Sequence, residues 1–462
     1  MLTHRRSSLS LLLALLVGLL IVGVGLATGF LVGIKPLYIG LALGAVPMLV
    51  YFFTNFEQAV IGLLILRSSL SGLSGLQIPS AYALAFDALT LLYVTVMLLI
   101  GRKVHSDRFW WLFAVWVMLQ SLWLILMPLG GLGLDASFLG DGIREWVRRF
   151  TFLMVYLLVL QLKDRLHPQR VITLLFFSLV VPVTVALMQI PSGDRIQGTI
   201  GHPNAFATYL SLMIALTWWR LSLAERRLPW MLLLGLLAFA YVNTRSLAAL
   251  ITAGVLILVL NASKLNPIRI VGAVIVFSIV LALFASTGGG QERLNELLET
   301  PLLNPDMDVS RTIILAAGDG NSFNWRVTHW YYLLQSWQNH PILGYGIGTG
   351  PYLSPLRNDA GSPYTPHNDY IRFLAEQGIV GLALFIAFMG AQGIYLWRIL
   401  RRAPKGSSER QLCLILLGFL ISTLVNMLSN NVLDNGDFWF YWWAVFCVAG
   451  WGTERFQRAK EC

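Results

Sequence analysis

The chain has 462 residues, of which 56% are hydrophobic and only 12% are charged, and its mean hydropathy is +0.69. Soluble domains carry about 25% charged residues, so this composition excludes a set of soluble domains and predicts an integral membrane protein. The formal net charge of +10 does not indicate a nucleic-acid partner, because cytoplasmic loops of membrane proteins collect Lys and Arg.

Apolar runs long enough to cross about 30 Å of hydrocarbon recur along almost the whole chain. The first is too long for a signal-peptide core and has no clear cleavage site, so we expect it to be retained as a span. A shorter run at 58–67 is a candidate for an additional span. Together the runs predict an all-α polytopic membrane protein with about 12–14 transmembrane helices. The other predicted spans cover residues 8–33, 37–53, 81–100, 110–128, 147–161, 171–190, 204–221, 230–243, 247–261, 270–286, 369–398, 412–429 and 438–453.

The basic loops predict the orientation of these spans. A cytoplasmic N-terminus and an even number of spans put five basic segments on the inside: GRKVHSDR, KDRLHPQR, AERRLP, SKLNPIR and RRAPKGSSER. Three parts of the chain follow from this arrangement. They are the N-terminal part of the helix bundle at 1–286, a large periplasmic loop at 287–367, and three C-terminal transmembrane helices at 368–462.

The large loop is predicted to be mostly non-helical, with one amphipathic helix in NWRVTHWYYLLQSWQNHP. Such a helix lies on the membrane surface, caps a cavity, or packs on the loop's own core. The stretch GYGIGTGPY follows, but it lacks the lysine and the helix of a phosphate-binding loop and does not predict nucleotide binding. The residues expected to share one face of the helix are Val327, Trp330, Tyr331, Leu334 and Trp337.

Several arginines lie at the outer ends of the predicted spans, against the general charge pattern. A single arginine there is commonly an interface anchor whose charged end reaches water. A group of them on one face suits a phosphorylated lipid, because guanidinium binds phosphate oxygens bidentately and stays charged. The arginines in question are Arg144, Arg148, Arg149, Arg195, Arg245 and Arg372.

Two histidines stand beside prolines at predicted helix starts. In YTPHND we expect Thr365 to cap the helix and His367 to lie in its first turn, and in GHPNAF His202 precedes Pro203. The positive end of a helix disfavours protonated histidine, so each ring can accept a proton from a hydroxyl. The alternative for both is a capping role. Gly378 and Gly381, on the face of His367, predict close approach of another helix.

Metal chemistry finds no support in the sequence. The outer side has no DxD, HExxH or paired Cys-His spacing, and Asp306, Asp308 and Asp319 are expected to be solvated. The sequence therefore predicts neither metal ligands nor a cofactor.

Three segments resemble the superfamily of O-antigen ligases and O-antigen polymerases. HNDYIRFLAEQGIVGL matches its pattern of His-Asn, nine residues, Gly, two residues and Gly, and RIQGTIGHPNAFATYL and NWR…W…HPILGYGIGTGPY agree with further segments. The resemblance implies a metal-independent, inverting glycosyltransferase of the bacterial inner membrane with a GT-C type helical fold. Its donor would be a glycan linked through pyrophosphate to undecaprenol, and its acceptor a hydroxyl on the periplasmic side.

The resemblance also implies roles for individual residues. His367 matches the histidine proposed to activate or position the acceptor hydroxyl, Arg195 and Arg245 match arginines thought to hold the pyrophosphate, and Arg326 matches a loop arginine. Arg148, Arg149 and Arg372 are further substrate-binding candidates that are chosen for position alone. His202, Asn204 and Asn368, which lie in the quoted segments, are also substrate-binding candidates.

Two enzymes fit this resemblance. A polymerase adds the growing glycan to another lipid-linked repeat and can work with a protein that regulates chain length, whereas a ligase transfers the glycan to lipid A-core or another acceptor. We favour the polymerase, because the chain has more predicted spans than the ligase branch. A transporter of sugars or lipid-linked glycans is the third interpretation, but the sequence has no inverted repeat or broken midplane helix.

Overall fold

The computed structural model describes residues 47–129, 132, 136–261, 267–286, 288–301, 303, 304, 306–316, 323–357 and 361–451. The predicted span at 8–33, most of the one at 37–53 and the end of the one at 438–453 lie outside these residues, as does Asp319. The chain divides into two compact units, and the division in the sequence falls between Leu63 and Leu64. In the first unit, residues 47–54 are helical and the helix α3 (Phe56–Leu70) begins.

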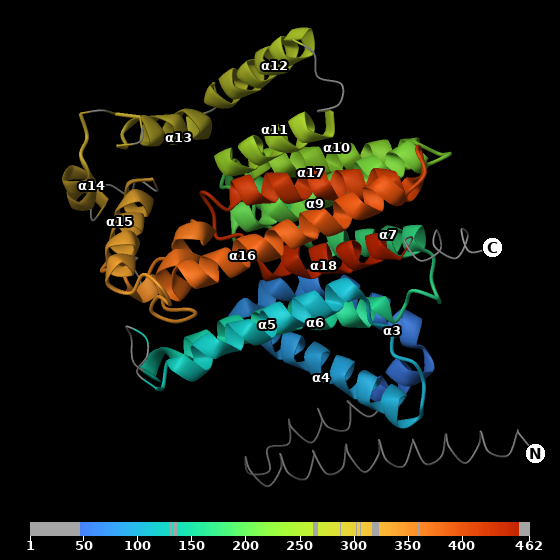
Figure 1. Ribbon diagram of the computed structural model, residues 1–462. Helices are drawn as coiled ribbons and strands as arrows, with labels where there is room; N and C mark the ends of the chain where they lie inside the picture. The colour runs from blue at the N-terminus through green and yellow to red at the C-terminus, as the bar shows by residue number, and fades with distance from the viewer. Residues whose placement is uncertain are drawn as a thin grey trace, which may run out of the picture. The chain divides into compact units, whose positions relative to one another are not determined.

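The second unit is built from helices (Figure 1). Across the residues that the structure describes, every named element is helical, and the one strand-like contact is an isolated bridge between Arg357 and Pro363. The α-helices after α3 are α4 (Ile78–Leu99), α5 (Arg108–Leu126), α6 (Leu139–Leu160), α7 (Pro168–Leu175), α8 (Val180–Gln189), α9 (Pro203–Leu223), α10 (Leu228–Asn243), α11 (Leu247–Asn261), α12 (Pro267–Ala285), α13 (Gly288–Leu298), α14 (Val309–Ala316), α15 (Asn324–Asn339), α16 (Asp369–Arg402), α17 (Ser408–Asn426) and α18 (Gly436–Gly450).

The predicted spans from residue 58 onward each coincide with a helix or with joined helices, which confirms an all-α polytopic membrane protein. The short run at 58–67 is part of α3, which a 3-10 turn extends to Leu76. Two shorter apolar helices cover Leu228–Asn243 and Leu247–Leu260. In the described part of the chain, the segments long and apolar enough to cross a membrane are Phe56–Leu76, Ile78–Leu99, Arg108–Leu126, Pro168–Ser192, Asp369–Arg402 and Ser408–Asn426.

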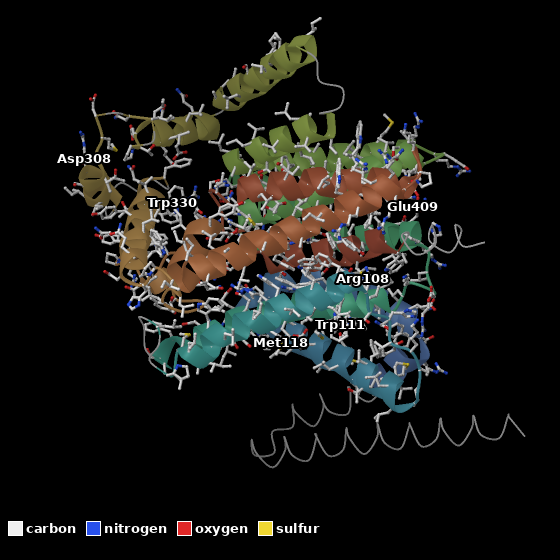
Figure 2. All side chains as sticks on the ribbon, viewed as in Figure 1. Arg108, Trp111, Met118, Asp308, Trp330 and Glu409 are labelled. Carbon is white, nitrogen blue, oxygen red and sulfur yellow. The ribbon has the colours of Figure 1, made fainter. Side chains whose placement is uncertain are left out.

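The exposed and buried helix faces follow from composition. The sequence of α18, GDFWFYWWAVFCVAG, is apolar on all sides, and every residue after its first is buried against neighbours that include α6 and α9. Helices at the periphery instead expose large apolar side chains, as expected of surfaces that face lipid. Trp111 and Met118 on α5, both 59% exposed, lie on such a surface (Figure 2).

Helix α16 is broken at Gly378, which has φ 64° and ψ −166°. The segment after α15 packs into the break: the N–H of Ile379 donates to the carbonyl of Pro341 at 2.9 Å. A Cβ at position 378 would lie 2.1 Å from the carbonyl oxygen of Ile342, so only glycine fits. The prediction that Gly378 and Gly381 admit another helix is wrong. The close neighbour of Gly378 is this connecting segment, and that of Gly381 is the side chain of Gln377.

The region 287–367 is more helical than predicted, since it contains α13 and α14 in addition to α15. Both extra helices are too short to cross a membrane, and α13 is also polar, so a search for apolar spans passes over them. The predicted face of α15 is also only partly correct. Tyr331 and Leu334 are exposed, whereas the buried residues are Asn324, Thr328, His329 and Leu333. Packing on α14 and α16 selects this neighbouring face.

Candidate active site

A cavity of about 390 Å³ opens where the starts of α9, α11 and α16 meet α15. It is lined on one side by α11, through Leu247, Ala248 and Ile251, and on another by aromatic side chains of α15. Six of the residues singled out in the sequence line it together: Arg195, His202, Asn204, Arg245, Arg326 and His367.

His367 stands before α16 in a left-handed conformation, with φ 51°. Asn368 caps the helix, because its Oδ1 accepts hydrogen bonds from the N–H groups of Tyr370 and Ile371, each at 3.1 Å. The predicted cap, Thr365, is therefore wrong, and its hydroxyl instead accepts a hydrogen bond from Asn431 at 2.6 Å. Moving the cap by three residues puts His367 in the turn that leads into the helix, where its ring meets the cavity.

The ring of His367 is packed but not oriented by a hydrogen bond. Its centroid lies 5.0 Å from that of Trp325 and 6.3 Å from that of His202. Nδ1 is buried and has no hydrogen-bond partner among the described residues, and the residue lines the cavity. Burial, followed by the charge of Arg326, holds the pKa of His367 well below its ordinary value. The imidazole is therefore neutral near pH 7.

His202 caps α9, since its Nδ1 accepts a hydrogen bond from the N–H of Asn204 at 3.2 Å. This bond fixes the neutral tautomer that carries its proton on Nε2. Burial, followed by Arg195 and Arg326, lowers the pKa of His202 to about 4. The cavity thus contains two neutral imidazoles, and His202 is the one arranged to donate from Nε2.

The cavity arginines are held by groups of the protein itself. Arg195 donates through Nε to the carbonyl of Thr244 and through Nη2 to Oδ1 of Asn204, both at 2.9 Å. Arg245 donates to the carbonyl of Gly193 at 3.0 Å. The guanidinium carbon of Arg326 lies 5.5 Å from the ring centroid of Trp325. Fixed guanidinium groups of this kind form a preorganised anion site.

Backbone strain is concentrated at this cavity. In the described part of the chain, three residues other than glycine have positive φ, and two of them are His367 and Arg245, at 51° and 47°. A left-handed conformation costs such residues about 1–3 kcal/mol and persists only where the surroundings impose it. Strain of this kind gathers at functional sites, which supports the cavity as the site.

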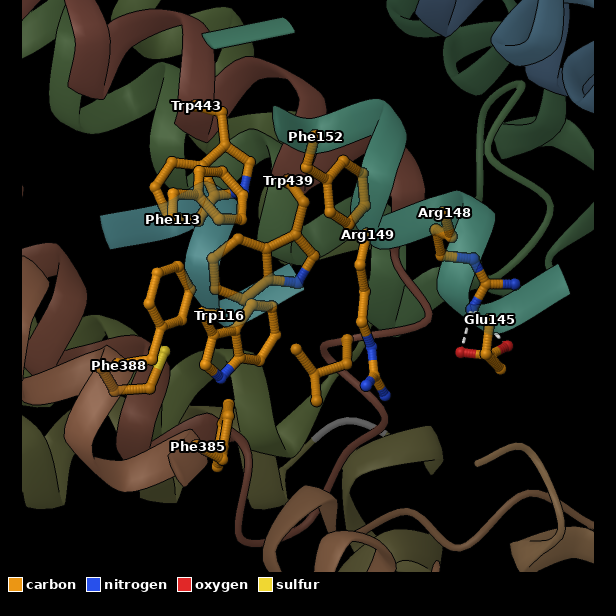
Figure 3. A pocket seen from close by; sticks show the side chains of 12 residues that line it. Phe113, Trp116, Glu145, Arg148, Arg149, Phe152, Phe385, Phe388, Trp439 and Trp443 are labelled. Atoms are coloured by element: carbon orange, nitrogen blue, oxygen red, sulfur yellow. Dashed lines mark hydrogen bonds and ion pairs between the residues drawn. The ribbon is translucent and has the colours of Figure 1, made fainter. Parts of the chain in front are cut away.

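Arg148 and Arg149 lie elsewhere and line a second cavity of about 30 Å³ (Figure 3). Arg372 does not line either cavity, but it shares acidic partners with Arg148. Arg372 pairs with Asp434 at 2.6 Å, with Glu376 at 3.0 Å and with Glu145 at 3.1 Å, and Arg148 pairs with Asp434 and Glu145, each at 2.9 Å. Burial raises the pKa of Asp434, but Arg372 and Arg148 outweigh it and lower that pKa overall. These arginines and carboxylates together form an ion-pair network within the protein.

Arg149 and Asn368 have individual surroundings. Arg149 donates to Gln120, and its guanidinium carbon lies 5.1 Å from the ring centroid of Phe373 and 5.8 Å from that of Trp116. Asn368 acts through its cap and through a hydrogen bond from its amide to the carbonyl of Leu428 at 3.0 Å. Neither residue lines the larger cavity.

The sequence reasoning missed Glu376, whose carboxylate is buried beneath the glycine-rich stretch 344–352. Its two oxygens accept hydrogen bonds from the N–H groups of Gly348 and Gly350, both at 3.0 Å. The amides that a phosphate-binding loop would offer to a ligand are thus taken by a side chain of the protein. This arrangement agrees with the prediction against nucleotide binding there.

The cavity is also lined by Trp325 and Trp330, two aromatic residues of the quoted segment to which the motif gives no role. Trp325 stacks on Tyr364 with ring centroids 4.4 Å apart, and Nε1 of Trp330 donates to the carbonyl of Pro366 at 2.6 Å. These contacts fix α15 against the turn that carries His367. Aromatic residues at helical spacing would have been a signal, but spacing alone does not tell which face of α15 packs inward.

Acid should weaken the fold through its buried histidines. Burial, followed by Arg357, lowers the pKa of His329 to about 4, and His202 has a similar value. Between pH 6.5 and about 4 the unfolded chain binds more protons than the folded one, so stability falls as the pH falls through this window. We expect His329→Leu to flatten the slope of melting temperature against pH. The check is a thermal melt series in detergent, with exposed His167→Asn as control, and an unchanged slope would contradict this.

Comparison with known families adds to this geometry. The structure is that of a helical, multi-pass membrane protein in which arginines and histidines line one cavity. The family model described as O-antigen ligase matches residues 230–386, from α10 to the middle of α16. The match confirms the resemblance to the O-antigen ligase and polymerase superfamily, whose members are glycosyltransferase-type proteins of the bacterial inner membrane. A search of curated proteins found no match.

Of the six cavity residues that were singled out in the sequence, the matched segment contains Arg245, Arg326 and His367. Arg195, His202 and Asn204 precede it. Within the described residues no group of three or more His, Cys, Asp or Glu side chains is arranged to hold a metal ion.

Proposed function

We propose that the protein is a metal-independent, inverting glycosyltransferase that polymerises glycan linked through pyrophosphate to undecaprenol. The observation that carries the proposal is the cavity itself, in which His367 lies beside His202 and three arginines. The second cavity, which Arg148 and Arg149 line, has no histidine in its lining. The family match at 230–386 supports a glycan substrate.

The reaction would transfer the growing glycan from its lipid carrier. Nε2 of His367 takes the proton of the acceptor hydroxyl as the oxygen attacks the anomeric carbon of the donor. The bond from that carbon to the pyrophosphate breaks, and undecaprenyl pyrophosphate leaves with the electron pair. Attack from the side opposite the leaving group inverts the anomeric configuration. The proton on His367 then passes to water.

The arginines would supply the charge stabilisation that a divalent metal provides in other transferases. Arg195, Arg245 and Arg326 hold the pyrophosphate, whose negative charge grows as the bond to carbon breaks. The apolar residues of α11 lie beside them and suit the lipid chain. Transfer by the purified protein should therefore persist in excess EDTA, and a strict need for Mg²⁺ would contradict this part of the proposal.

Two observations support a periplasmic site. His367 stands at the start of α16, and Arg401 and Arg402 lie in its last turn, at the opposite end of the span. The basic turn before α10, with Arg226 and Arg227, comes at the far end of α9 from His202. Basic residues gather on the cytoplasmic side, so the cavity would face the periplasm.

A ligase is the second candidate, because the matched family model carries the description O-antigen ligase. Glycan from a deletion strain of the source bacterium separates the two enzymes on a gel. Loss of a polymerase leaves a single repeat on lipid A-core, whereas loss of a ligase leaves bare core and accumulates lipid-linked polymer. Normal surface glycan in the deletion strain would contradict both.

Removing the charge of Arg245 should weaken binding of the leaving group. We expect Arg245→Gln to reduce affinity for farnesyl pyrophosphate, a short polyprenyl pyrophosphate, by about 10-fold or more, as lost charge-assisted hydrogen bonds are worth about 1.5–3 kcal/mol. Titration calorimetry in detergent measures this. The control is Arg144→Gln, because Arg144 is 73% exposed and pairs with Asp141 outside the cavity. Equal affinities for the two variants would remove Arg245 from the site.

A further inference from the structure

The connection between α17 and α18, residues 427–435, joins the two histidine-bearing helix starts. It follows the matched family segment by some forty residues, and no motif pointed to it. Two adjacent asparagines in it, Asn430 and Asn431, contact different helix starts. Ser429, the residue before them, lines the cavity.

Asn431 holds the turn that carries His367. Its Oδ1 accepts a hydrogen bond from the backbone N–H of His367 at 2.5 Å, and its Nδ2 donates to the hydroxyl of Thr365 at 2.6 Å. These bonds bracket Pro366, which has no N–H to contribute. The strained left-handed backbone of His367 is therefore held from both sides by one side chain.

Asn430 holds the start of α9 in a similar way. Its Oδ1 accepts a hydrogen bond from Nδ2 of Asn204 at 2.9 Å, and its own Nδ2 donates to Oδ1 of Asn426. The other end of the Asn204 side chain accepts from Arg195. Asn430 is thus linked through Asn204 to Arg195, a candidate for binding the pyrophosphate. Asn204 also donates its N–H to the capping ring of His202.

The connection is itself held by two acidic side chains, the buried Asp369 and the partly exposed Asp434. Oδ2 of Asp369 accepts hydrogen bonds from the N–H groups of Val432 and Leu433, at 2.9 and 3.1 Å. Asp434 pairs with Arg372 and Arg148. The ion-pair network around the second cavity therefore anchors the segment that carries both asparagines.

We propose that Asn430 and Asn431 are positioning residues that set the placement of His202 and His367 across the cavity. The inference rests on the proposed function, since it assigns a task to residues of the same site. A catalytic imidazole is commonly oriented through its second ring nitrogen, but Nδ1 of His367 has no such partner among the described residues. The hydrogen bond that the backbone N–H of His367 donates to Oδ1 of Asn431 takes its place.

The test compares substitutions at Asn431 in a transfer assay with lipid-linked repeat extracted from a deletion strain. Asn431→Ala should lower kcat by about 10–100-fold with little change in KM, because a catalytic group displaced by about 1 Å costs up to about 100-fold. Asn431→Asp keeps the accepting oxygen and should restore most of the rate above pH 8. The added carboxylate favours imidazolium, so the acid limb of its pH profile should move upward.

Two asparagines supply matched controls. Asn435→Ala removes hydrogen bonds to Ala205 and to the start of α18 from the same connection, but it touches neither histidine. Asn339→Ala changes an exposed residue at the end of α15. If Asn431→Ala loses no more kcat than Asn435→Ala at matched melting temperatures, the positioning role is wrong.

A second readout does not depend on transfer. The charged and titratable groups that act on the pKa of His367 are Arg326 and His329 from α15, His202 before α9, and Asp434 in the connection. In ¹⁵N-histidine-labelled protein, Asn431→Asp should raise the pKa of His367, and Asn435→Ala should leave it unchanged. If Asn431→Asp raises the pKa of His367 but the wild-type protein transfers no glycan, the proposed function is wrong and the positioning role stands. An unmoved pKa would sink the positioning role.

Discussion

Replacement of His367 by Asn is expected to reduce glycan transfer by about 10²–10⁴-fold and to leave the melting temperature nearly unchanged. The loss follows because the amide cannot take the proton of the acceptor hydroxyl. Asn is the informative replacement, since it tolerates the left-handed backbone that His367 adopts, with φ 51°. His367→Ala should lose transfer as well and also melt earlier, because alanine keeps the strain. Transfer rates and melting curves of purified protein measure both effects.

The matched control is His167→Asn. His167 precedes a proline and caps α7 through Nδ1, which accepts a hydrogen bond from Gln169 at 3.4 Å, so its local sequence copies that of His202. It does not line the cavity that contains His367. This variant should transfer glycan at the wild-type rate. Stable His367→Asn protein that produces full-length surface glycan would show that another group activates the acceptor.

Replacement of Glu376 by Ala is expected to lower the free energy of unfolding by about 3 kcal/mol or more. The carboxylate, 1% exposed, accepts hydrogen bonds from Gly348, Gly350 and Arg372, and the substitution leaves these buried donors short of a partner. Glu376→Gln retains one accepting oxygen and should lose less. Unfolding of purified protein by denaturant measures the difference.

Glu225→Ala provides the comparison for Glu376, because Glu225 is exposed in the turn before α10. Equal unfolding free energies for the two variants would mean that the glycine-rich stretch does not depend on its carboxylate. A second expected sign is faster amide exchange at Gly348 and Gly350 in Glu376→Ala, confined at first to that stretch.

The membrane helices could be predicted because a span must be long and apolar throughout, which leaves a direct record in sequence. The exact ends of these helices could not be predicted from the sequence. Thr365 and Asn368 are both good caps, and the choice of Asn368 depends on Asn431, which arrives from a distant helix connection. Likewise, a glycine pattern in α16 predicts close packing but not the break at Gly378, which needs the segment after α15 in place.

The candidate site, too, could be predicted only in part. Arg195, Arg245 and His367 could be chosen from motifs, and they line one cavity. Arg148 and Arg372 were chosen from their place at span ends, and they pair with Asp434 from a remote part of the chain. Such pairing needs three-dimensional proximity, which no local spacing records. The asparagine contacts were missed for that reason too.

The connection at 427–435 sets a limit on recombination between related transferases. A chimera that exchanges only residues 230–386 would bring His367 and Arg326 from one parent and keep Asn430, Asn431 and Arg195 from the other. In its cavity, helix starts from one parent would be supported by side chains from the other, and the two sets have not evolved together. Exchanges meant to transfer acceptor preference should therefore carry 195–204 and 427–435 along with the loop.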